Sequence, residues 1–395
     1  MSDFTTELQN RLADLRAQQL HRELRRVDSA QGSRIVINGQ TLLNFSSNDY
    51  LGLANHPALK EAAIRAARDF GAGAGASRLV CGSLAPFHEL EEALAAFKGT
   101  EAALTFSTGY VTALGTITAL LGKDDIIIVD KLVHACIVDA AKLSGAKLRV
   151  FAHNDLNDLE DKLRWATNNK SEIRYPKPEI LIVTESVFSM DGDAAPLREI
   201  VALKDKYGAW LMVDEAHATG LYGTHRRGLA EALGVSDRIE IQMGTLGKAL
   251  GASGGYICGS RALVDFLVNR ARSFIFSTAP VPAAAAAATA ALQLVSSTKG
   301  KALNEHLWSR VTEFQSQIEN PRSKMGSAII PLILGEESAA VAAAAKLRGQ
   351  GIFVPAIRYP TVARGAARLR VTFTAAHTNE DVATLVGALS QIRHA

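Results

Sequence analysis

The chain has 395 residues, 48% of them hydrophobic, and its 43 basic and 40 acidic side chains leave a formal net charge of +3. This length and composition predict one large domain with a smaller one, and the balanced charge gives no reason to expect nucleic acid or a membrane as a partner. The three cysteines are far apart and match neither a disulfide framework nor a metal-ligand spacing. The N-terminal segment is charged and unlike a secretory signal, so we expect a cytoplasmic protein without a bound metal.

The first part of the chain predicts a helix, a short strand and two loops. Leucines at helical spacing among charged residues predict an amphipathic helix over residues 4–26, which packs either on the protein's own body or on a partner subunit. A strand is expected at 33–37, and the polar, turn-rich segment 44–53 is typical of a loop that lines a site. The glycine-rich segment 71–78 lacks the preceding strand of a dinucleotide-binding fingerprint, so we interpret it as a flexible loop near a ligand.

From residue 100 onward, short β-rich runs alternate with helical runs, a pattern that predicts an α/β fold with right-handed crossovers. We expect seven strands in a mostly parallel sheet, at residues 103–106, 126–129, 148–151, 180–184, 210–213, 239–243 and 254–258.

The pattern changes after about residue 290. Strands at 328–334, 352–358 and 367–374, with helices at 338–349 and 379–392, predict a small C-terminal α/β domain. The expected organisation is therefore an N-terminal helix and strand over residues 1–45, a large domain over 46–290 and a small domain over 291–395.

Polar residues follow directly after five of the expected strands, and the two most informative are Lys248 and Asp214. Lys248 lies among glycines in GTLGKALG (244–251), where a partly desolvated amine becomes nucleophilic. Asp214 ends a strand and is followed by His217. Because ligands bind at the carboxyl ends of parallel strands, this pairing suits a pyridoxal phosphate site, in which a lysine forms a Schiff base and a carboxylate keeps the ring nitrogen protonated. A phosphate cradle is expected at Ser107–Tyr110, where a helix begins.

A different class of protein is suggested by the letters VDEAH at 213–217, which spell a DEAH-type NTPase box. That reading requires a phosphate loop of the form G-x-x-x-x-G-K-[ST]. The sequence has Gln242 and Ala249 where that loop needs glycine and a hydroxyl residue, so we reject it.

Motifs along nearly the whole chain resemble those of the α-oxoamine synthases, pyridoxal phosphate enzymes of the aspartate-aminotransferase-like fold (fold type I). The matching segments are NFSSNDYLGL at 44–53, FSTGY at 106–110, HNDLNDLE at 153–160, TESVFSMDGDAAPL at 184–197, VDEAHATGLYG at 213–223, GTLGKALG at 244–251 and LRVTFTAAHT at 369–378.

The resemblance implies that Lys248, His134, Asp214 and His217 are the catalytic residues. Lys248 would hold the cofactor and act as general base, Asp214 would pair with the ring nitrogen, and His134 would stack on the ring beside the substrate. The other cofactor residues implied are His217 and Ser189 at the phenolic oxygen, and Gly109, Tyr110, Thr245 and, from the other subunit of a homodimer, Thr278 at the phosphate.

The resemblance also implies substrate positions. Asn48 and Arg370 would bind the amino acid carboxylate, while Arg22 and Thr361 would contact the acyl substrate, with Arg25 and Arg26 as alternatives to Arg22. Within the family, the chain most resembles the branch that condenses L-alanine with a pimeloyl thioester, carried either by coenzyme A or by an acyl carrier protein. The alternative is a glycine-using branch such as 2-amino-3-ketobutyrate CoA ligase, which takes acetyl-coenzyme A.

Overall fold

The structure is a computed structural model that describes residues 3–168, 178–318 and 326–393. The chain forms two compact units, and each is described by itself. Unit 1 comprises residues 1–50, 190–192 and 306–395, and unit 2 comprises residues 51–189 and 193–305. The sequence places its divisions near residues 45 and 290, whereas the units divide after Tyr50 and after Glu305, within helix α12 (Thr298–Gln317).

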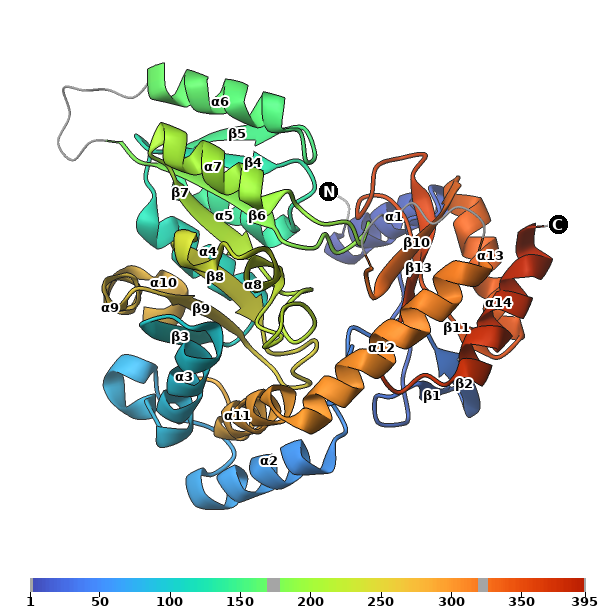
Figure 1. The fold of residues 1–395 in the computed structure, drawn as a ribbon. Helices are drawn as coiled ribbons and strands as arrows, with labels where there is room; N and C mark the ends of the chain where they lie inside the picture. Colours follow the sequence, from blue (N-terminus) through green and yellow to red (C-terminus); the bar gives the residue numbers. More distant parts are fainter. Residues whose placement is uncertain (1–2, 169–177, 319–325, 394–395) are drawn as a thin grey trace. The chain divides into compact units, whose positions relative to one another are not determined.

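Unit 2 contains the expected seven-stranded sheet (Figure 1). Its strands are β3 (Ala102–Phe106), β4 (Ile126–Asp130), β5 (Lys147–Phe151), β6 (Ile180–Glu185), β7 (Trp210–Asp214), β8 (Ile241–Thr245) and β9 (Gly255–Gly259). Their spatial order is β3-β9-β8-β7-β6-β4-β5. The strands from β8 to β5 are parallel, while β9 runs antiparallel to both β3 and β8. The predicted α/β fold with a mostly parallel sheet is confirmed.

Helices cover both faces of this sheet, because each central strand is apolar on both sides. In β6, Leu181 and Val183 belong to the core on one face, and Ile180 and Ile182 belong to the core on the other. The first face packs against α4 (Gly109–Leu120), α5 (Ala135–Ser144), α9 (Arg261–Arg270) and α10 (Arg272–Ile275). The second packs against α6 (Leu156–Asn168), α7 (Leu197–Tyr207) and α8 (Leu229–Leu233), as Figure 1 shows. A further group contains α2 (Pro57–Phe70), α3 (Ala85–Lys98) and α11 (Pro282–Ser296), with α11 against both of the others.

Unit 1 contains two small sheets. One has the order β1-β2-β11, with β1 (Arg34–Ile37), β2 (Gln40–Asn44) and β11 (Ile352–Phe353). The other has the order β10-β13-β12, with β10 (Ile329–Gly335), β13 (Ala367–Thr372) and β12 (Ala356–Ile357). The helices of this unit are α1 (Phe4–Ala17), α13 (Glu337–Gly349) and α14 (Asn379–Arg393), together with the second part of α12.

Two predicted elements of unit 1 have the wrong bounds. The N-terminal helix ends at Ala17 instead of continuing to residue 26, because Gln19 has a left-handed φ of 57° and the N–H groups of Leu20 and His21 both bond to the Leu15 carbonyl. The strand expected at 352–358 is divided between two sheets, since Pro355 has no N–H to donate to a ladder.

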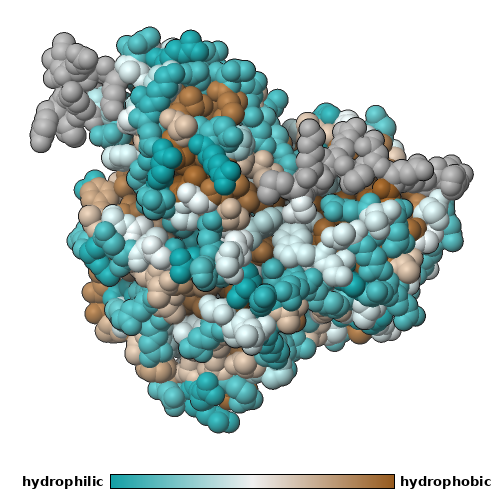
Figure 2. Space-filling model, viewed as in Figure 1, coloured by the Kyte–Doolittle hydropathy of each residue, from teal (hydrophilic) through white to brown (hydrophobic). Residues whose placement is uncertain are grey.

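On the face drawn in Figure 2, hydrophilic residues are mixed with smaller hydrophobic patches. Among the described residues, no helix is both long enough and apolar enough to span a bilayer.

Candidate functional site

The carboxyl ends of the parallel strands of unit 2 surround a pocket of about 180 Å³. Glu185 at the end of β6 is the register partner of Asp214 at the end of β7, and Asp214 is in turn the partner of Met243 in β8. The residues that line the pocket are Gly109, Tyr110, His134, Cys136, Glu185, Asp214, Ala216, His217, Met243, Thr245 and Lys248.

Lys248 lies on the loop between the antiparallel neighbours β8 and β9. The Leu246 N–H donates to the Gly254 carbonyl at 3.0 Å, and the Gly251 N–H donates to the Lys248 carbonyl at 2.9 Å. These two backbone hydrogen bonds fix the conformation of the loop. Gly251 has φ +59°, and a Cβ there would lie 2.5 Å from the backbone of Leu53. Only glycine fits this position, which is why the lysine has a glycine close on its C-terminal side.

The Lys248 side chain points at the end of β7. Its Nζ lies 2.8 Å from Nε2 of His217, and both residues line the same pocket as Asp214. Oδ1 of Asp214 accepts the Ala216 N–H at 2.9 Å, which fixes the carboxyl at the start of the turn. Burial raises the pKa of Asp214, whereas Lys248 acts in the opposite direction. A further cationic group beside Asp214 would therefore stabilise the ionised form of this buried carboxyl.

His134 forms the N-cap of α5. Its Nδ1 accepts the Cys136 N–H at 3.2 Å and lies 3.0 Å from the Cys136 sulfur, so in the neutral ring the proton is on Nε2. Burial lowers the pKa of His134, and this favours the neutral form. A neutral, fixed imidazole at the pocket wall suits stacking against a flat ring.

The first turn of α4 supplies backbone N–H groups to the pocket. The Thr108 hydroxyl accepts the Val111 N–H at 3.3 Å, while Gly109 and Tyr110 begin the helix and line the pocket. The Tyr110 hydroxyl donates to the Asp139 carboxylate, which holds its ring in place. Thr245 faces this turn from the end of β8. N–H groups at a helix N-terminus together with a hydroxyl are suited to a phosphate.

A buried ion pair stabilises the turn that follows Asp214 at the end of β7. Nζ of Lys98, on α3, lies 2.5 Å from Oε2 of Glu215, and both side chains are 1% exposed. Oε1 of Glu215 accepts the Ala230 N–H at 2.9 Å. Glu215 thus ties the turn after Asp214 to two helices.

Seven residues predicted for the cofactor site line this one pocket: Lys248, Asp214, His217, His134, Gly109, Tyr110 and Thr245. Ser189 and Thr278 do not line it. Ser189 lies in the turn after β6, and Thr278 forms a bridge with Ser77.

Sequence reasoning missed the pocket-lining roles of Cys136, Ala216 and Met243. Glu185 is one of the polar residues at the ends of the five expected strands. The position of Cys136, two residues after His134, was the available signal. The strand register that brings Glu185 beside Asp214 leaves no local signal.

In unit 1, the predicted carboxylate-binding residues contact each other. Nη2 of Arg370, on β13, donates to Oδ1 of Asn48 at 3.0 Å, and Nη1 donates to Thr372 at 2.9 Å. Arg370 is 4% exposed, so its guanidinium is held in one orientation.

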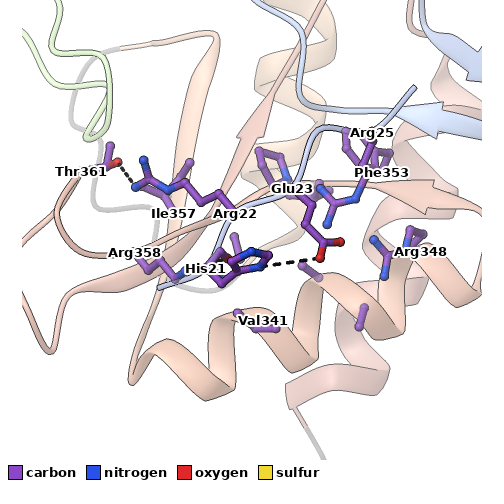
Figure 3. A pocket seen from close by; sticks show the side chains of 15 residues that line it. His21, Arg22, Glu23, Arg25, Val341, Arg348, Phe353, Ile357, Arg358 and Thr361 are labelled. Carbon is purple, nitrogen blue, oxygen red and sulfur yellow. Dashed lines mark hydrogen bonds and ion pairs between the residues drawn. The ribbon is translucent and has the colours of Figure 1, made fainter. Parts of the chain in front are cut away.

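Unit 1 also contains a basic pocket of about 350 Å³ near the predicted acyl residues (Figure 3). Nη2 of Arg22 donates to the Thr361 hydroxyl at 3.3 Å, whereas Arg25 lies over the Phe353 ring and Arg26 pairs with Asp28. Of the three arginines considered from the sequence, Arg22 is the one that contacts Thr361. Nη2 of Arg358 donates to the His21 carbonyl at 2.7 Å and fixes the segment that carries Arg22.

Comparison with known proteins agrees with this fold. The profile described as aminotransferase class I and II matches residues 40–389, so the chain belongs to that family. Among solved structures, a variant of serine palmitoyltransferase from S. paucimobilis with bound PLP has a TM-score of 0.90 and 28% identity, and the match covers 100% of this chain and 99% of that one. The 8-amino-7-oxononanoate synthase of Francisella tularensis has a TM-score of 0.73 and 28% identity, covering 89% of this chain and 98% of that one.

Curated relatives indicate to which group within this family the chain belongs. The 8-amino-7-oxononanoate synthase of Geotalea daltonii is 48% identical over 99% of this chain and 98% of its own length. The enzyme of the same name from Geobacter sulfurreducens is 47% identical, over 98% of each chain. Within its family, the chain therefore belongs with the 8-amino-7-oxononanoate synthases.

Proposed function

We propose that this chain catalyses the pyridoxal phosphate-dependent condensation of L-alanine with a pimeloyl thioester, which yields 8-amino-7-oxononanoate for biotin synthesis. The observation that carries the proposal is the pocket at the strand ends of unit 2, where Lys248 contacts His217 beside the buried Asp214. The relatives named for this reaction match over nearly the whole chain.

The residues of the pocket fit the cofactor. Asp214 is a buried carboxyl that a cationic ring nitrogen would compensate, and the first turn of α4 with Thr245 presents donors for a phosphate. When bound, pyridoxal phosphate supplies a ring that accepts electrons from the α-carbon of an amino acid. Lys248 would hold it covalently, His134 would lie against its face, and His217 with Ser189 would contact its phenolic oxygen. We assign Gly109, Tyr110 and Thr245 to the phosphate, with Thr278 acting on the partner's site in a homodimer.

The net reaction makes one carbon–carbon bond. The α-carbon of alanine attacks the acyl carbon, the C–S bond breaks and the thiol leaves, and the alanine carboxylate departs as CO₂. Lys248 is the residue placed to remove the α-proton, and a proton returns to the same carbon after decarboxylation. General base catalysis of this kind contributes roughly 10²–10⁴-fold.

The substrate residues of unit 1 suit two carboxylates. An arginine fork binds a carboxylate through two parallel hydrogen bonds, and Asn48 orients the Arg370 fork, so this pair is assigned to the alanine carboxylate. The basic pocket with Arg22, Arg358 and Thr361 is assigned to the far end of the pimeloyl chain, which ends in a carboxylate or its ester. An acetyl group would leave these donors unused.

The test compares two substrate pairs in one thiol-release assay with product mass measured in parallel. L-alanine with pimeloyl-coenzyme A or a pimeloyl carrier protein should release thiol and give 8-amino-7-oxononanoate. Glycine with acetyl-coenzyme A should react at least tenfold more slowly in kcat/KM. One methyl group is worth about 1–3 kcal/mol, or roughly 10–200-fold, so a difference larger than this would require discrimination on the acyl side as well.

Arg22→Ala serves as the matched variant, since it should weaken the pimeloyl reaction and leave the acetyl reaction unchanged. A faster reaction with glycine and acetyl-coenzyme A would instead make the chain a 2-amino-3-ketobutyrate ligase.

A further inference from the structure

Glu185 is a buried carboxyl in the cofactor pocket to which the proposed reaction gives no role. It ends β6, is 2% exposed and lines the pocket beside Asp214. The two residues are register partners on adjacent parallel strands, which lie about 4.8 Å apart. Among the described residues, Oε1 of Glu185 is buried without a hydrogen-bond partner.

The other contacts of Glu185 connect it to two loops of the site. The backbone N–H groups of His134 and Ser189 both act on its carboxyl as hydrogen-bond donors. His134 follows β4 and Ser189 follows β6, so a single side chain joins the loop of the stacking imidazole to the loop of the proposed phenolic-oxygen contact. Buried polar groups joined in this way orient the residues around them.

Two buried carboxyls this close together cannot both be ionised at low cost. Of the two carboxyls, Asp214 is the one we expect to be ionised. Lys248 is the largest influence that lowers its pKa, followed by the N–H of Ala216 and then His134. Burial, and after it the negative charge of Asp214, raise the pKa of Glu185 to about 8. Burial raises the pKa of both carboxyls, so the pair shares one proton at low cost. Glu185 is the better place for it, because an ionised Glu185 would leave Oε1 buried and charged without a hydrogen-bond donor among the described residues.

We propose that Glu185 is a positioning residue of the cofactor site that works as a neutral carboxylic acid, joining the His134 and Ser189 loops and leaving the negative charge of the strand-end pair on Asp214. This inference rests on the proposed function, because it concerns the same pocket. A neutral acid there keeps the loops in place without competing with Asp214 for the cationic ring nitrogen.

Replacing a carboxyl by an amide should affect cofactor binding differently at Glu185 and at Asp214. Glu185→Gln preserves the shape of a neutral acid, while Asp214→Asn removes the charge that the ring nitrogen needs. The measurement is the dissociation constant of pyridoxal phosphate for the cofactor-free variants, with their melting temperatures recorded before cofactor is added. Glu185→Gln should stay within about threefold of the wild-type constant, and Glu185→Ala and Asp214→Asn should each raise it more than about tenfold.

A pH series adds a readout that a purely structural role would not change. The titratable groups that line the pocket with Glu185 are Tyr110, His134, Cys136, Asp214, His217 and Lys248, and the Glu185→Gln protein retains all of them. Above pH 8 the affinity of the wild type should depend on pH differently from that of Glu185→Gln, because only the wild type loses the Glu185 proton there.

The outcomes separate the two proposals. If Glu185→Gln weakens cofactor binding as much as Glu185→Ala while its melting temperature is unchanged, Glu185 works as a carboxylate and the inference is wrong. Matching pH profiles for wild type and Glu185→Gln would also overturn it. If instead Asp214→Asn binds the cofactor as tightly as wild type, the assignment of this pocket to pyridoxal phosphate is wrong, and the proposed function is overturned together with the role of Glu185.

Discussion

We assign the covalent chemistry of the site to Lys248, whose amine contacts His217 in the turn after β7. Lys248→Ala should reduce kcat by roughly 10³-fold or more, because both the covalent attachment and the general base are lost. Borohydride treatment followed by mass spectrometry should show cofactor fixed to the wild type and absent from the variant. Lys301→Ala is the matched control, since the Lys301 side chain is 66% exposed and forms a surface ion pair with Glu305. Fixed cofactor in Lys248→Ala would show that another lysine holds it.

His377 is a buried histidine outside the site whose neutrality stabilises unit 1. It stacks on Phe45 at 4.1 Å, its Nδ1 accepts the Thr374 N–H at 3.1 Å, and its Nε2 therefore donates to the Asn44 carbonyl at 3.0 Å. Protonation would place an N–H against the Thr374 N–H. Burial lowers the pKa of His377 to about 4.

We expect an acid-sensitive stability from this residue. Since the folded pKa is depressed, the stabilisation is present above the unfolded value near 6.5 and is lost as pH falls toward 4, by up to about 3 kcal/mol. The measurement is urea unfolding between pH 7 and pH 4. His377→Phe keeps the stacking, so its unfolding free energy should depend less steeply on pH in this window. Equal slopes for the two proteins would contradict the prediction.

At the scale of elements, His153 joins three loops at the carboxyl edge of the sheet. Nδ1 contacts Asp130 at the end of β4 at 2.9 Å, and Nε2 contacts Asp193 in the loop after β6 at 2.7 Å. Oδ1 of Asp130 also accepts the Leu132 N–H, close to His134. Burial alone would lower the pKa of His153, but the bonds to Asp130 and Asp193 raise it to about 10.

His153→Gln should therefore destabilise the protein by about 3 kcal/mol at pH 7, because it leaves the buried Asp130 without its cationic partner. The raised pKa means that this stabilisation is complete below pH 6.5 and disappears as pH rises through 10. The difference in unfolding free energy between wild type and variant should shrink accordingly in denaturant titrations from pH 7 to pH 10.5. His225→Gln removes a histidine–carboxylate pair whose histidine is 66% exposed, and it should cost less than about 1 kcal/mol. If the difference in unfolding free energy between wild type and His153→Gln did not depend on pH, the charge of His153 would not contribute to stability.

At the scale of the whole molecule, we expect a homodimer in which Thr278 completes the partner's phosphate site. Thr278 pairs with Ser77 and does not line the Lys248 pocket of its own chain. Light scattering should therefore give twice the chain mass of 42.1 kDa.

Mixed dimers distinguish action within a chain from action across the interface. Lys248→Ala in one chain and Thr278→Arg in the other should leave one intact site and about half of the wild-type activity. Both changes in the same chain, paired with a wild-type partner, should leave none, because the remaining Lys248 site would receive the altered Thr278. The reverse pattern would place Thr278 in its own chain's site.

Much of the fold was predictable because its signals are local. All seven strands of the large sheet lie within two residues of their expected positions, since short apolar runs bounded by turns mark buried strands. The positions of Lys248, Asp214 and the turn at Gly109 in one pocket were predictable for the same reason, as each follows shortly after such a run. The N-terminal helix was overextended, because leucine spacing continues past Ala17 although the backbone turns at Gln19.

The sequence alone therefore determined the class of fold, the strand-end residues and the family. Only the tertiary structure decided which strands are neighbours, and with that the pairing of Glu185 with Asp214 and the antiparallel β9 that closes the Lys248 loop. It also decided that Arg22 contacts Thr361, 339 positions away. Such pairings depend on burial and hydrogen bonding between distant segments, whereas periodicity and turn chemistry describe only how a segment relates to its immediate neighbours.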